Sequence, residues 1–378
     1  MHKIRVLIVD DEVTVRSRLT KVLFSDPELD VVGAAANGRI ALAKIPQVNP
    51  DVVLLDVEMP EMDGLETLTA IRKTHPLLPV ISIGTFSDRQ STVTLQALSL
   101  GATNYATMPT KADSSDAAIQ HIRENLIPKI KVFGSGSQRL QVPTVKPKSI
   151  AVPTRQLTKS TIAKEVPVGR TLTTTVVSSP SQVDVVAIGG SIGGPNALAV
   201  VLPKLPADLP VPIVIVQHMP PMFTKLLAER LASKCQIRVD EAVSGAVLEP
   251  GHAWIAPGDF HMIVARNGKV VRIRTHQEPP ENSCRPAVDV LFRSVAEVYG
   301  GGAIVVVLTG MGQDGLRGCK CIRDVGGQIL AQDEASSVVW GMPGFVANAG
   351  LADKVIPLDQ IGGEIIRRLK ENRAKTGD

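Results

Sequence analysis

The chain of 378 residues is long enough for two or three domains, because a single domain typically uses about 150 residues. Hydrophobic residues make up 44% and charged residues 21% of the sequence, which excludes a wholly disordered or collagen-like chain. Its apolar runs are much shorter than the ~20 residues of a membrane span, and the first residues lack a signal-peptide pattern. Four cysteines without a CxxC pair are too few for a disulfide framework. We therefore expect a cytoplasmic protein with reduced thiols and no membrane insertion.

The net charge of +4 comes from the middle of the chain. Residues 1–133 carry 14 basic against 16 acidic side chains, residues 134–182 carry 7 against 1, and residues 183–378 carry 20 of each. The middle segment is rich in Pro, Ser and Thr and cannot bury enough apolar surface to form a core, which predicts a linker. An alternative is that its basic residues bind nucleic acid or an acidic membrane surface. Stacking aromatic residues and an amphipathic period are missing from it, so we expect no nucleic-acid partner.

Strand and helix patterns alternate in the first third of the chain. Apolar, β-branched runs at residues 3–9, 51–55 and 79–83 predict strands, and helical spacing of Val and Leu follows the first of them. This rhythm is typical of a doubly wound α/β domain with a parallel sheet. Such a sheet binds ligands outside the carboxyl ends of its strands.

Three carboxylates fall at these predicted strand ends. Asp10 and Asp11 follow the first strand, and Asp56 follows the second. Clustered carboxylates repel one another, and a hard divalent cation such as Mg²⁺ relieves that repulsion. Asp10 and Asp11 can alternatively cap the next helix. Because Asp56 closes a separate strand, an acidic metal pocket formed by all three is the favoured interpretation.

In the second half of the chain, a glycine-rich turn follows a predicted strand at residues 183–188. The sequence GGSIGGP places Ser191 in a Gly-x-Ser-x-Gly turn between strand and helix, which is typical of an exposed nucleophile at a sheet edge. Pro195 fits the first turn of a helix, whose free amides can stabilise an oxyanion. One alternative is a phosphate-binding loop, although the spacing matches neither the dinucleotide nor the Walker motif. Another is a turn without chemistry.

A serine hydroxyl needs a base, and four histidines occur in this half of the chain. His218 directly follows the apolar run VPIVIV at residues 211–216. If that strand is parallel to the one before Ser191, both side chains reach the same sheet edge. His252 and His261 flank a turn-rich stretch, where hydrogen-bonded structural or substrate-rim roles are favoured.

A third apolar run, AIVVVL, leads to Asp314. Asp289 and Asp259 are rival candidates that are less favoured, because neither ends such a strand. We predict a serine hydrolase in which Ser191 is the nucleophile, His218 is the general base and then acid, and Asp314 orients the imidazole.

The motifs IVDDE (residues 8–12) and LLDVEMPEMDG (residues 54–64) resemble those of response-regulator receiver domains. The resemblance implies a flavodoxin-like fold, Asp56 as the phosphoacceptor, and a Mg²⁺ ion held by Asp10, Asp11 and Asp56. It also implies phosphorylation by a histidine kinase.

Two positions depart from the receiver pattern. Gly84 replaces a Ser or Thr, with Thr85 adjacent, and Met108 replaces a Lys, with Lys111 close in sequence. A thioether cannot make the charge-assisted bond that an ammonium makes with an acyl phosphate. These departures therefore affect the coupling from phosphate to output more than phosphorylation itself.

The second half of the chain resembles the methylesterase domain of chemotaxis response regulator protein-glutamate methylesterases. The motifs are GGSIGG, QHMPP, LTGMGQDG and SSVVWGMPG. The resemblance implies a mainly parallel α/β domain that hydrolyses glutamate methyl esters on chemoreceptor cytoplasmic helices, releases methanol and often deamidates glutamines. It assigns the catalytic roles to Ser191, His218 and Asp314. It also implies that the unphosphorylated receiver covers the active site and that the chemotaxis histidine kinase relieves the block.

Three departures in this domain are milder, because they leave the catalytic residue types intact: Ile192 and Gln313 replace Thr and Asn, and Cys284 replaces His.

We expect a receiver at residues 1–125, a linker at 126–182 and a catalytic domain at 183–372. Two other functions are possible. The first is a non-catalytic module, in which a degenerate receiver and its partner domain only bind receptors or a kinase. The replaced residues Gly84 and Met108 support this function, whereas the complete set of Ser, His and Asp opposes it. A DNA-binding regulator is opposed by the neutral, strand-rich output half.

Overall fold

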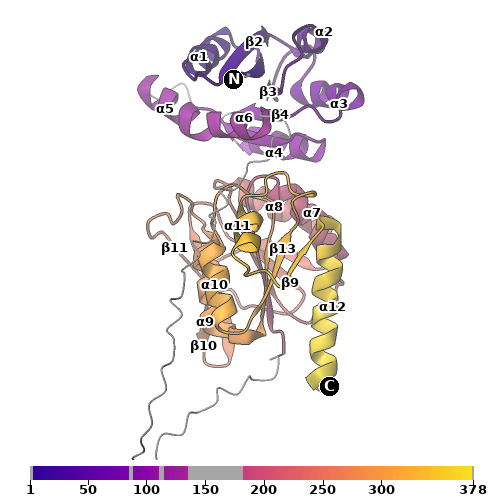
Figure 1. The fold of residues 1–378 in the computed structure, drawn as a ribbon, viewed down its shortest axis with the longest axis vertical. Coiled ribbons are helices and arrows are strands. Elements are labelled where there is room, and N and C mark those ends of the chain that lie inside the picture. The colour runs from indigo at the N-terminus through magenta and orange to yellow at the C-terminus, as the bar shows by residue number, and fades with distance from the viewer. Residues whose placement is uncertain (1–2, 85–87, 110–114, 135–181, 377–378) are drawn as a thin grey trace, which may run out of the picture.

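The computed structural model describes residues 3–84, 88–109, 115–134 and 182–376. These residues form two α/β units, each built on a parallel sheet, and Figure 1 shows the amino-terminal unit stacked on one end of the carboxyl-terminal unit. The fold class predicted from the sequence is confirmed. None of the helices in these ranges is long and apolar enough to cross a membrane.

The first unit is a five-stranded sheet in the order β2-β1-β3-β4-β5, with all neighbours parallel. Its central strands are buried runs of Val, Ile and Leu, as expected for a parallel sheet covered on both faces. The sequence predicts β1, β3 and β4 closely and does not predict β2 and β5. The strands are β1 (Ile4–Val9), β2 (Leu29–Ala35), β3 (Val52–Asp56), β4 (Val80–Gly84) and β5 (Asn104–Thr107).

Helices connect these strands in a doubly wound arrangement. One group contains α1 and α5, which touch each other, and the other contains α2, α3 and α4, which touch in a row. A capping box starts α3, because the Asp63 and Glu66 side chains each accept a hydrogen bond from the other residue's backbone amide. The helices are α1 (Val13–Phe24), α2 (Gly38–Val48), α3 (Gly64–Thr74), α4 (Asp88–Ser99) and α5 (Ser115–Asn125).

A further helix, α6 (Ile127–Gly134), packs against β1 and β3. Its Ile130 and Phe133 belong to the hydrophobic cluster of the receiver sheet. This helix lies within the predicted linker at 126–182, and residues 135–181 of that range lie outside the described residues. The positions of the domain boundaries stay a prediction.

The second unit is a seven-stranded sheet in the order β14-β13-β12-β6-β7-β9-β8, again with all neighbours parallel. An antiparallel hairpin of β10 and β11 lies beside it. The strands are β6 (Val185–Gly190), β7 (Ile213–Gln217), β8 (Arg238–Glu241), β9 (His252–Ile255), β10 (His261–Asn267), β11 (Val270–His276), β12 (Ala303–Val307), β13 (Gln328–Gln332) and β14 (Lys354–Ile356).

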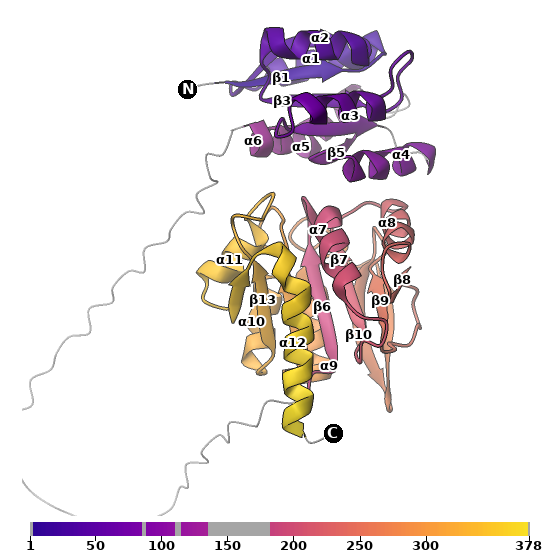
Figure 2. The ribbon, with the colours of Figure 1, turned by 90° about the vertical axis from the view of Figure 1, so that its right-hand side faces the viewer.

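The central strands β12, β6 and β7 are adjacent and completely buried, so their carboxyl ends meet at one sheet edge. Figure 2 shows the receiver above this end of the sheet. The helices of the unit are α7 (Gly194–Val201), α8 (Phe223–Ala232), α9 (Val288–Tyr299), α10 (Leu316–Asp324), α11 (Met342–Asn348) and α12 (Leu358–Thr376), with 3₁₀ turns at Leu202–Lys204 and Gly300–Gly302.

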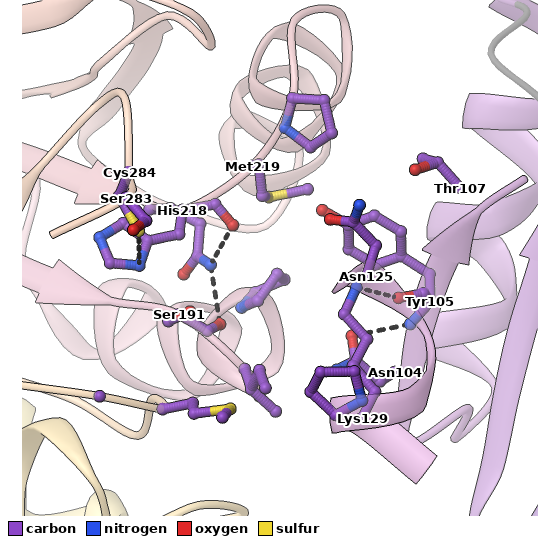
Figure 3. Close-up of a pocket in the computed structure, with 18 of the residues that line it drawn as sticks. Asn104, Tyr105, Thr107, Asn125, Lys129, Ser191, His218, Met219, Ser283 and Cys284 are labelled. Atoms are coloured by element: carbon purple, nitrogen blue, oxygen red, sulfur yellow. Dashed lines mark hydrogen bonds between the residues drawn. The ribbon is translucent and has the colours of Figure 1, made fainter. Parts of the chain in front are cut away.

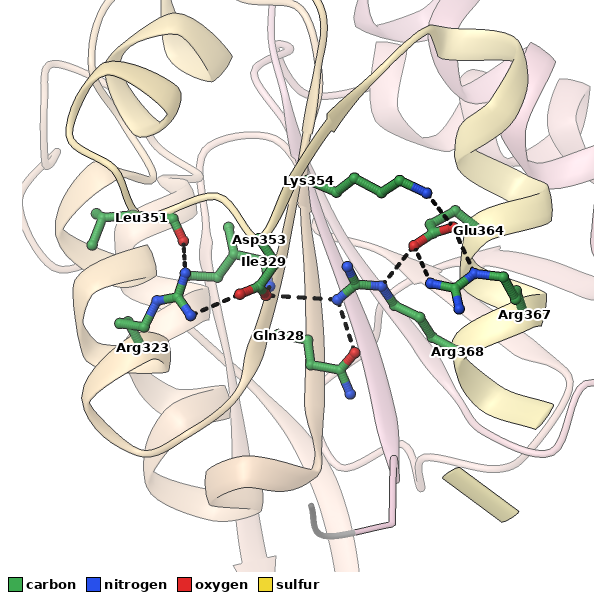
Figure 4. A network of polar contacts seen from close by, with 9 residues as sticks. All are labelled: Arg323, Gln328, Ile329, Leu351, Asp353, Lys354, Glu364, Arg367 and Arg368. Atoms are coloured by element: carbon green, nitrogen blue, oxygen red, sulfur yellow. Dashed lines mark hydrogen bonds and ion pairs between the residues drawn. The ribbon is translucent and has the colours of Figure 1, made fainter. Parts of the chain in front are cut away.

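The last helix, α12, is tied to the sheet by a polar network around Glu364 (Figure 4). The nearly buried Glu364 carboxylate accepts hydrogen bonds from Arg367, Arg368 and Lys354, and the bond from Arg367 contributes most to holding its pKa far below the usual range. Arg368 also donates to the Gln328 side chain at 2.8 Å. The paired charge therefore fixes α12 against β13 and β14.

We expect Gly64→Ala to destabilise the receiver. A Cβ at Gly64 would lie 2.2 Å from the Asp56 carbonyl oxygen and 2.6 Å from the Val57 Cα, and both are backbone atoms. The free energy of unfolding measured in urea should fall by about 1–3 kcal/mol. The control is Gly363→Ala in α12, where the added Cβ would meet no atom within 4 Å among the described residues outside its own stretch of helix. Alanine there should stabilise by about 0.5–1 kcal/mol, and equal effects of both substitutions would contradict this account.

Candidate active site and receiver pocket

Ser191 lies at the turn between β6 and α7, as its motif predicts. Its amide donates to the Thr309 carbonyl oxygen at 3.0 Å, which fixes the turn to the loop after β12. Gly193 has a φ of 82°, in the left-handed region that favours glycine. A Cβ at Gly194 would lie 1.8 Å from the Gln217 Oε1 atom. The glycines therefore give Ser191 its position at the sheet edge.

His218 and Asp314 form a hydrogen-bonded pair at the same edge. His218 follows β7, Asp314 lies in the turn before α10, and the His218 Nε2 and Asp314 Oδ2 atoms are 2.7 Å apart. Ser191 Oγ makes no hydrogen bond to any of the described residues. The three residues thus reach one edge, with a direct contact only between His218 and Asp314.

The Asp314 carboxylate is surrounded by hydrogen-bond donors. Its Oδ2 atom accepts from the Val288 amide at 2.6 Å, and its Oδ1 atom accepts from the amides of Asp289 and Gly315 at 2.9 and 3.0 Å. The Asn282 side chain donates to Oδ1 at 2.8 Å. Because an ionised carboxylate only accepts, the His218 Nε2 atom must carry the hydrogen in this pair.

The same contacts set the charge states of the pair. Burial alone would raise the pKa of Asp314, but its hydrogen bonds, first that to His218, hold it below the ordinary value. Burial alone would lower the pKa of His218, but its bonds to Asp314 and Cys284 raise it to about 10. The structure therefore favours an ionised Asp314 beside a strongly basic imidazole.

A second contact of His218 is with Cys284, in the loop before α9. The Cys284 Sγ atom lies 3.5 Å from His218 Nδ1. The sequence singles out Cys284 only as a departure from a family pattern and Gln217 only as the first residue of the QHMPP motif, and it gives no signal for Asn282. Gln217 donates to the Ser191 carbonyl oxygen at 2.8 Å. These roles depend on loop conformation, including the positive φ of Asn282.

The other residues weighed as candidates have different partners. Asp289 accepts from the Gly318 amide at 2.7 Å, and Asp259 pairs with Arg285. His252 pairs with Asp240 at 2.8 Å. Both ring nitrogens of His261 are used, one by the Ala287 amide and the other by the Pro279 carbonyl oxygen. None of these four residues forms a hydrogen bond with Ser191 or His218 within the described part of the chain.

Ser191 and His218 line a pocket of about 720 Å³ between the two units, with Asp314 buried behind His218. Figure 3 shows its two walls, with Ser191, His218 and Met219 facing side chains of the receiver. The receiver wall includes Asn104, Tyr105, Thr107, Asn125 and Lys129. The receiver therefore covers the edge at which Ser191 lies.

Aromatic and polar contacts hold the receiver in this place. The rings of Tyr105 and Phe223 stack with centroids 4.9 Å apart. The Leu95 carbonyl oxygen accepts from Arg230, and that of Leu98 accepts from Asn196, at 3.2 and 3.3 Å.

The fit at this interface is incomplete. The buried Nε atom of Arg230 and the buried Nδ2 atom of Asn104 have no hydrogen-bond partner among the described residues. Each unpaired group costs docking free energy.

Within the receiver, Asp10, Asp11 and Asp56 place one carboxylate oxygen each within 4.8 Å of one another. Burial raises the pKa of Asp10 to about 6 and that of Asp56 to about 7, and the neighbouring carboxylates add to both shifts. A set of oxygen donors that repel one another fits a hard divalent cation. The predicted acidic cluster is therefore present.

Met108, which stands where the family has Lys, is buried, and its amide donates to the Gly84 carbonyl oxygen at 2.7 Å. Thr85 and Lys111, the neighbours considered as substitutes, lie outside the described residues.

Two family models match the chain: the response regulator receiver domain over residues 6–120, and the CheB methylesterase over residues 186–365. A protein-glutamate methylesterase/protein-glutamine glutaminase of Trichodesmium erythraeum is 54% identical over 369 residues, which cover 98% of this chain and 100% of the relative. One of Nocardioides sp. is 44% identical over 375 residues, covering 99% and 97%. The solved CheB methylesterase catalytic domain of Thermotoga maritima is 42% identical, covers 49% of this chain and 98% of its own, and has a TM-score of 0.49.

Proposed function

This chain belongs to the family of protein-glutamate methylesterases/protein-glutamine glutaminases with a receiver domain, and we propose that Ser191, His218 and Asp314 are its catalytic residues. The resemblance seen in the sequence is thereby confirmed at the level of the family. One observation carries the assignment of the residues: three adjacent parallel strands lead to Ser191 and the His218–Asp314 pair at one edge, where Ser191 and His218 line one pocket.

The proposed reaction begins with the neutral imidazole of His218. Its Nε2–H donates to Asp314, so only Nδ1 can accept a proton. In the proposed step Ser191 Oγ attacks the ester carbonyl carbon and passes its proton to Nδ1. The resulting imidazolium is stabilised by the Asp314 carboxylate.

In this proposal the backbone amides of Ile192 and Gly193 donate hydrogen bonds to the oxyanion of the tetrahedral intermediate. They precede α7 and donate none of the hydrogen bonds formed among the described residues. Collapse of the intermediate breaks the bond to the methoxy oxygen, which takes the proton from His218 and leaves as methanol. Water, deprotonated by the same imidazole, then hydrolyses the acyl-serine to glutamate. With a glutamine side chain the same sequence releases ammonia.

We propose methyl-accepting chemoreceptors as the substrates, through glutamate side chains exposed on their cytoplasmic helices, with a cytoplasmic location for the enzyme. The open, glycine-rich sheet edge supports a protein substrate, because it admits a side chain presented from a helix. The receiver wall of the pocket must move away first.

For control, we propose that the chemotaxis histidine kinase phosphorylates Asp56. Asp10, Asp11 and Asp56 would hold Mg²⁺, which neutralises charge on the transferring phosphoryl group. Phosphorylation would weaken the docking of the receiver and uncover Ser191.

Replacing the nucleophile should abolish hydrolysis. Ser191→Ala is expected to lower methanol release from a methylated receptor cytoplasmic fragment by at least about 10³-fold, because it removes the hydroxyl proposed to form the acyl intermediate. Ser233→Ala, at an exposed serine after α8, is the control and should keep the wild-type rate. Substantial release by Ser191→Ala would contradict the assignment.

Removing the phosphoacceptor Asp56 should make the rate of methanol release independent of the phosphodonor. In wild-type protein, a small-molecule phosphodonor with Mg²⁺ is expected to raise the rate of methanol release, and chelation of the metal should prevent the increase. Asp56→Asn should keep the basal rate and lose the increase. Asp116→Asn, an exposed residue in the first turn of α5, should respond like the wild type. A normal response of Asp56→Asn would refute control through this residue.

A charge placed in the interface should free the active site without a phosphodonor. Leu98 of α4 is buried and lines the pocket, so Leu98→Asp would bury an unpaired carboxylate in the docked state. Because 1.4 kcal/mol is a factor of ten, unstimulated methanol release should rise at least about tenfold. Phe24→Asp, 75% exposed in α1, is the control. An unchanged basal rate in Leu98→Asp, with circular dichroism unchanged, would argue against a covering role of the receiver.

A further inference from the structure

We propose that Cys284 is a positioning residue for the base: its thiol holds His218 Nδ1 in the docked chain and releases that nitrogen to Ser191 for ester cleavage. The inference rests on the proposed role of His218, and it concerns a contact between two side chains at 3.5 Å.

The direction of this hydrogen bond follows from the surroundings of Asp314. Among the described residues, its other hydrogen bonds come from N–H donors: three backbone amides and the Asn282 side chain. The imidazole must also donate to it, so its hydrogen sits on Nε2 and its lone pair on Nδ1. In the neutral pair, the Cys284 S–H is then the donor to Nδ1.

The loop that carries Cys284 is held firmly. Glu281 and Cys284 exchange both backbone hydrogen bonds, at 3.1 and 2.9 Å. Between them, the Asn282 side chain donates to both Asp314 and Asp289. On the other side, the Arg285 guanidinium pairs with Asp259. These contacts place the Cys284 thiol against the His218 imidazole, and the Asn282 side chain ties the same loop to the Asp314 carboxylate.

Ser191 is placed equally firmly but lacks the bond that catalysis needs. Its amide and carbonyl are fixed by Thr309, Gly194 and Gln217, while its Oγ atom has no hydrogen-bond partner among the described residues. Ser191 and Cys284 line the same pocket. Since the single lone pair on Nδ1 accepts one good hydrogen bond at a time, the hydroxyl must displace the thiol.

The contact also affects the basicity of the imidazole. The titratable groups that interact with the His218 ring are Asp314, after β12, and Cys284, in the loop before α9. Burial opposes their effect, and together they raise the pKa of His218 to about 10. The protonated ring donates its Nδ1–H to the Cys284 sulfur, and this bond to the charged form raises the pKa of His218. Loss of the sulfur should therefore lower this pKa, so that more of the base is neutral at a given pH.

The first measurement is the pH profile of kcat/KM for methanol release by full-length protein treated with phosphodonor. For Cys284→Ala, the acid limb should move to lower pH, raising the ratio of kcat/KM at pH 8 to that at pH 10 by at least about threefold. Cys284→Ser keeps a hydroxyl that can make the same hydrogen bond, so its profile should stay closer to that of the wild type. Cys235→Ser, at a half-buried thiol that does not line the pocket, is the control and should keep the wild-type profile.

The second measurement does not depend on activity. The full-length, unphosphorylated chain is labelled with ¹⁵N-histidine, and the His218 ring signals, assigned with His218→Gln, are titrated by NMR. The titration midpoint should fall in Cys284→Ala relative to the wild type and stay unchanged in Cys235→Ser. A lower midpoint together with the shifted activity profile supports the proposal, and either change without the other, or neither, overturns it.

Failure of the proposed function itself would look different. It would appear as absent methanol release by the wild type, or as release retained by Ser191→Ala, and both are measured on chains that keep Cys284.

Discussion

The arrangement of the site depends on one buried carboxylate. Asp314 receives hydrogen bonds from the first amides of α9, from its own turn, from Asn282 and from His218. An ionised group that is nearly inaccessible to water is stable only when donors surround it. The hydrogen bonds that Asp314 accepts therefore fix three features together: the tautomer of the His218 imidazole, the start of α9 and the loop that carries Cys284.

The sequence predicts the parts of the site that the parallel sheet itself determines. Ser191, His218 and Asp314 each follow a continuous buried run, and runs of this kind become neighbouring parallel strands whose ends share one edge. The acidic cluster of the receiver is predictable for the same reason, since Asp10 and Asp56 end adjacent strands.

Features that depend on loops and on surfaces between units leave no periodic signal. Asn282 joins Asp314 to Asp289 only because two consecutive residues, Asn282 and Ser283, adopt positive φ values. The stacking of Tyr105 on Phe223 joins residues of different units. Helix α6 falls in a basic, proline-containing stretch, yet Ile130 and Phe133 bury its apolar face on the receiver. Composition averaged over a long window does not reveal a helix of two turns.

The unpaired Nε of Arg230 and Nδ2 of Asn104 have a consequence for the working range of the enzyme. Each unpaired buried group weakens docking, and a cover held by about 2.7 kcal/mol would leave roughly 1% of molecules open at any moment. The open fraction sets the basal rate of hydrolysis. Complete opening can then raise that rate by at most the reciprocal of this fraction, about 100-fold for 1%. Under the proposed control, how tightly the two units dock, more than the chemistry proposed at Ser191, therefore sets how widely the methylesterase rate can vary.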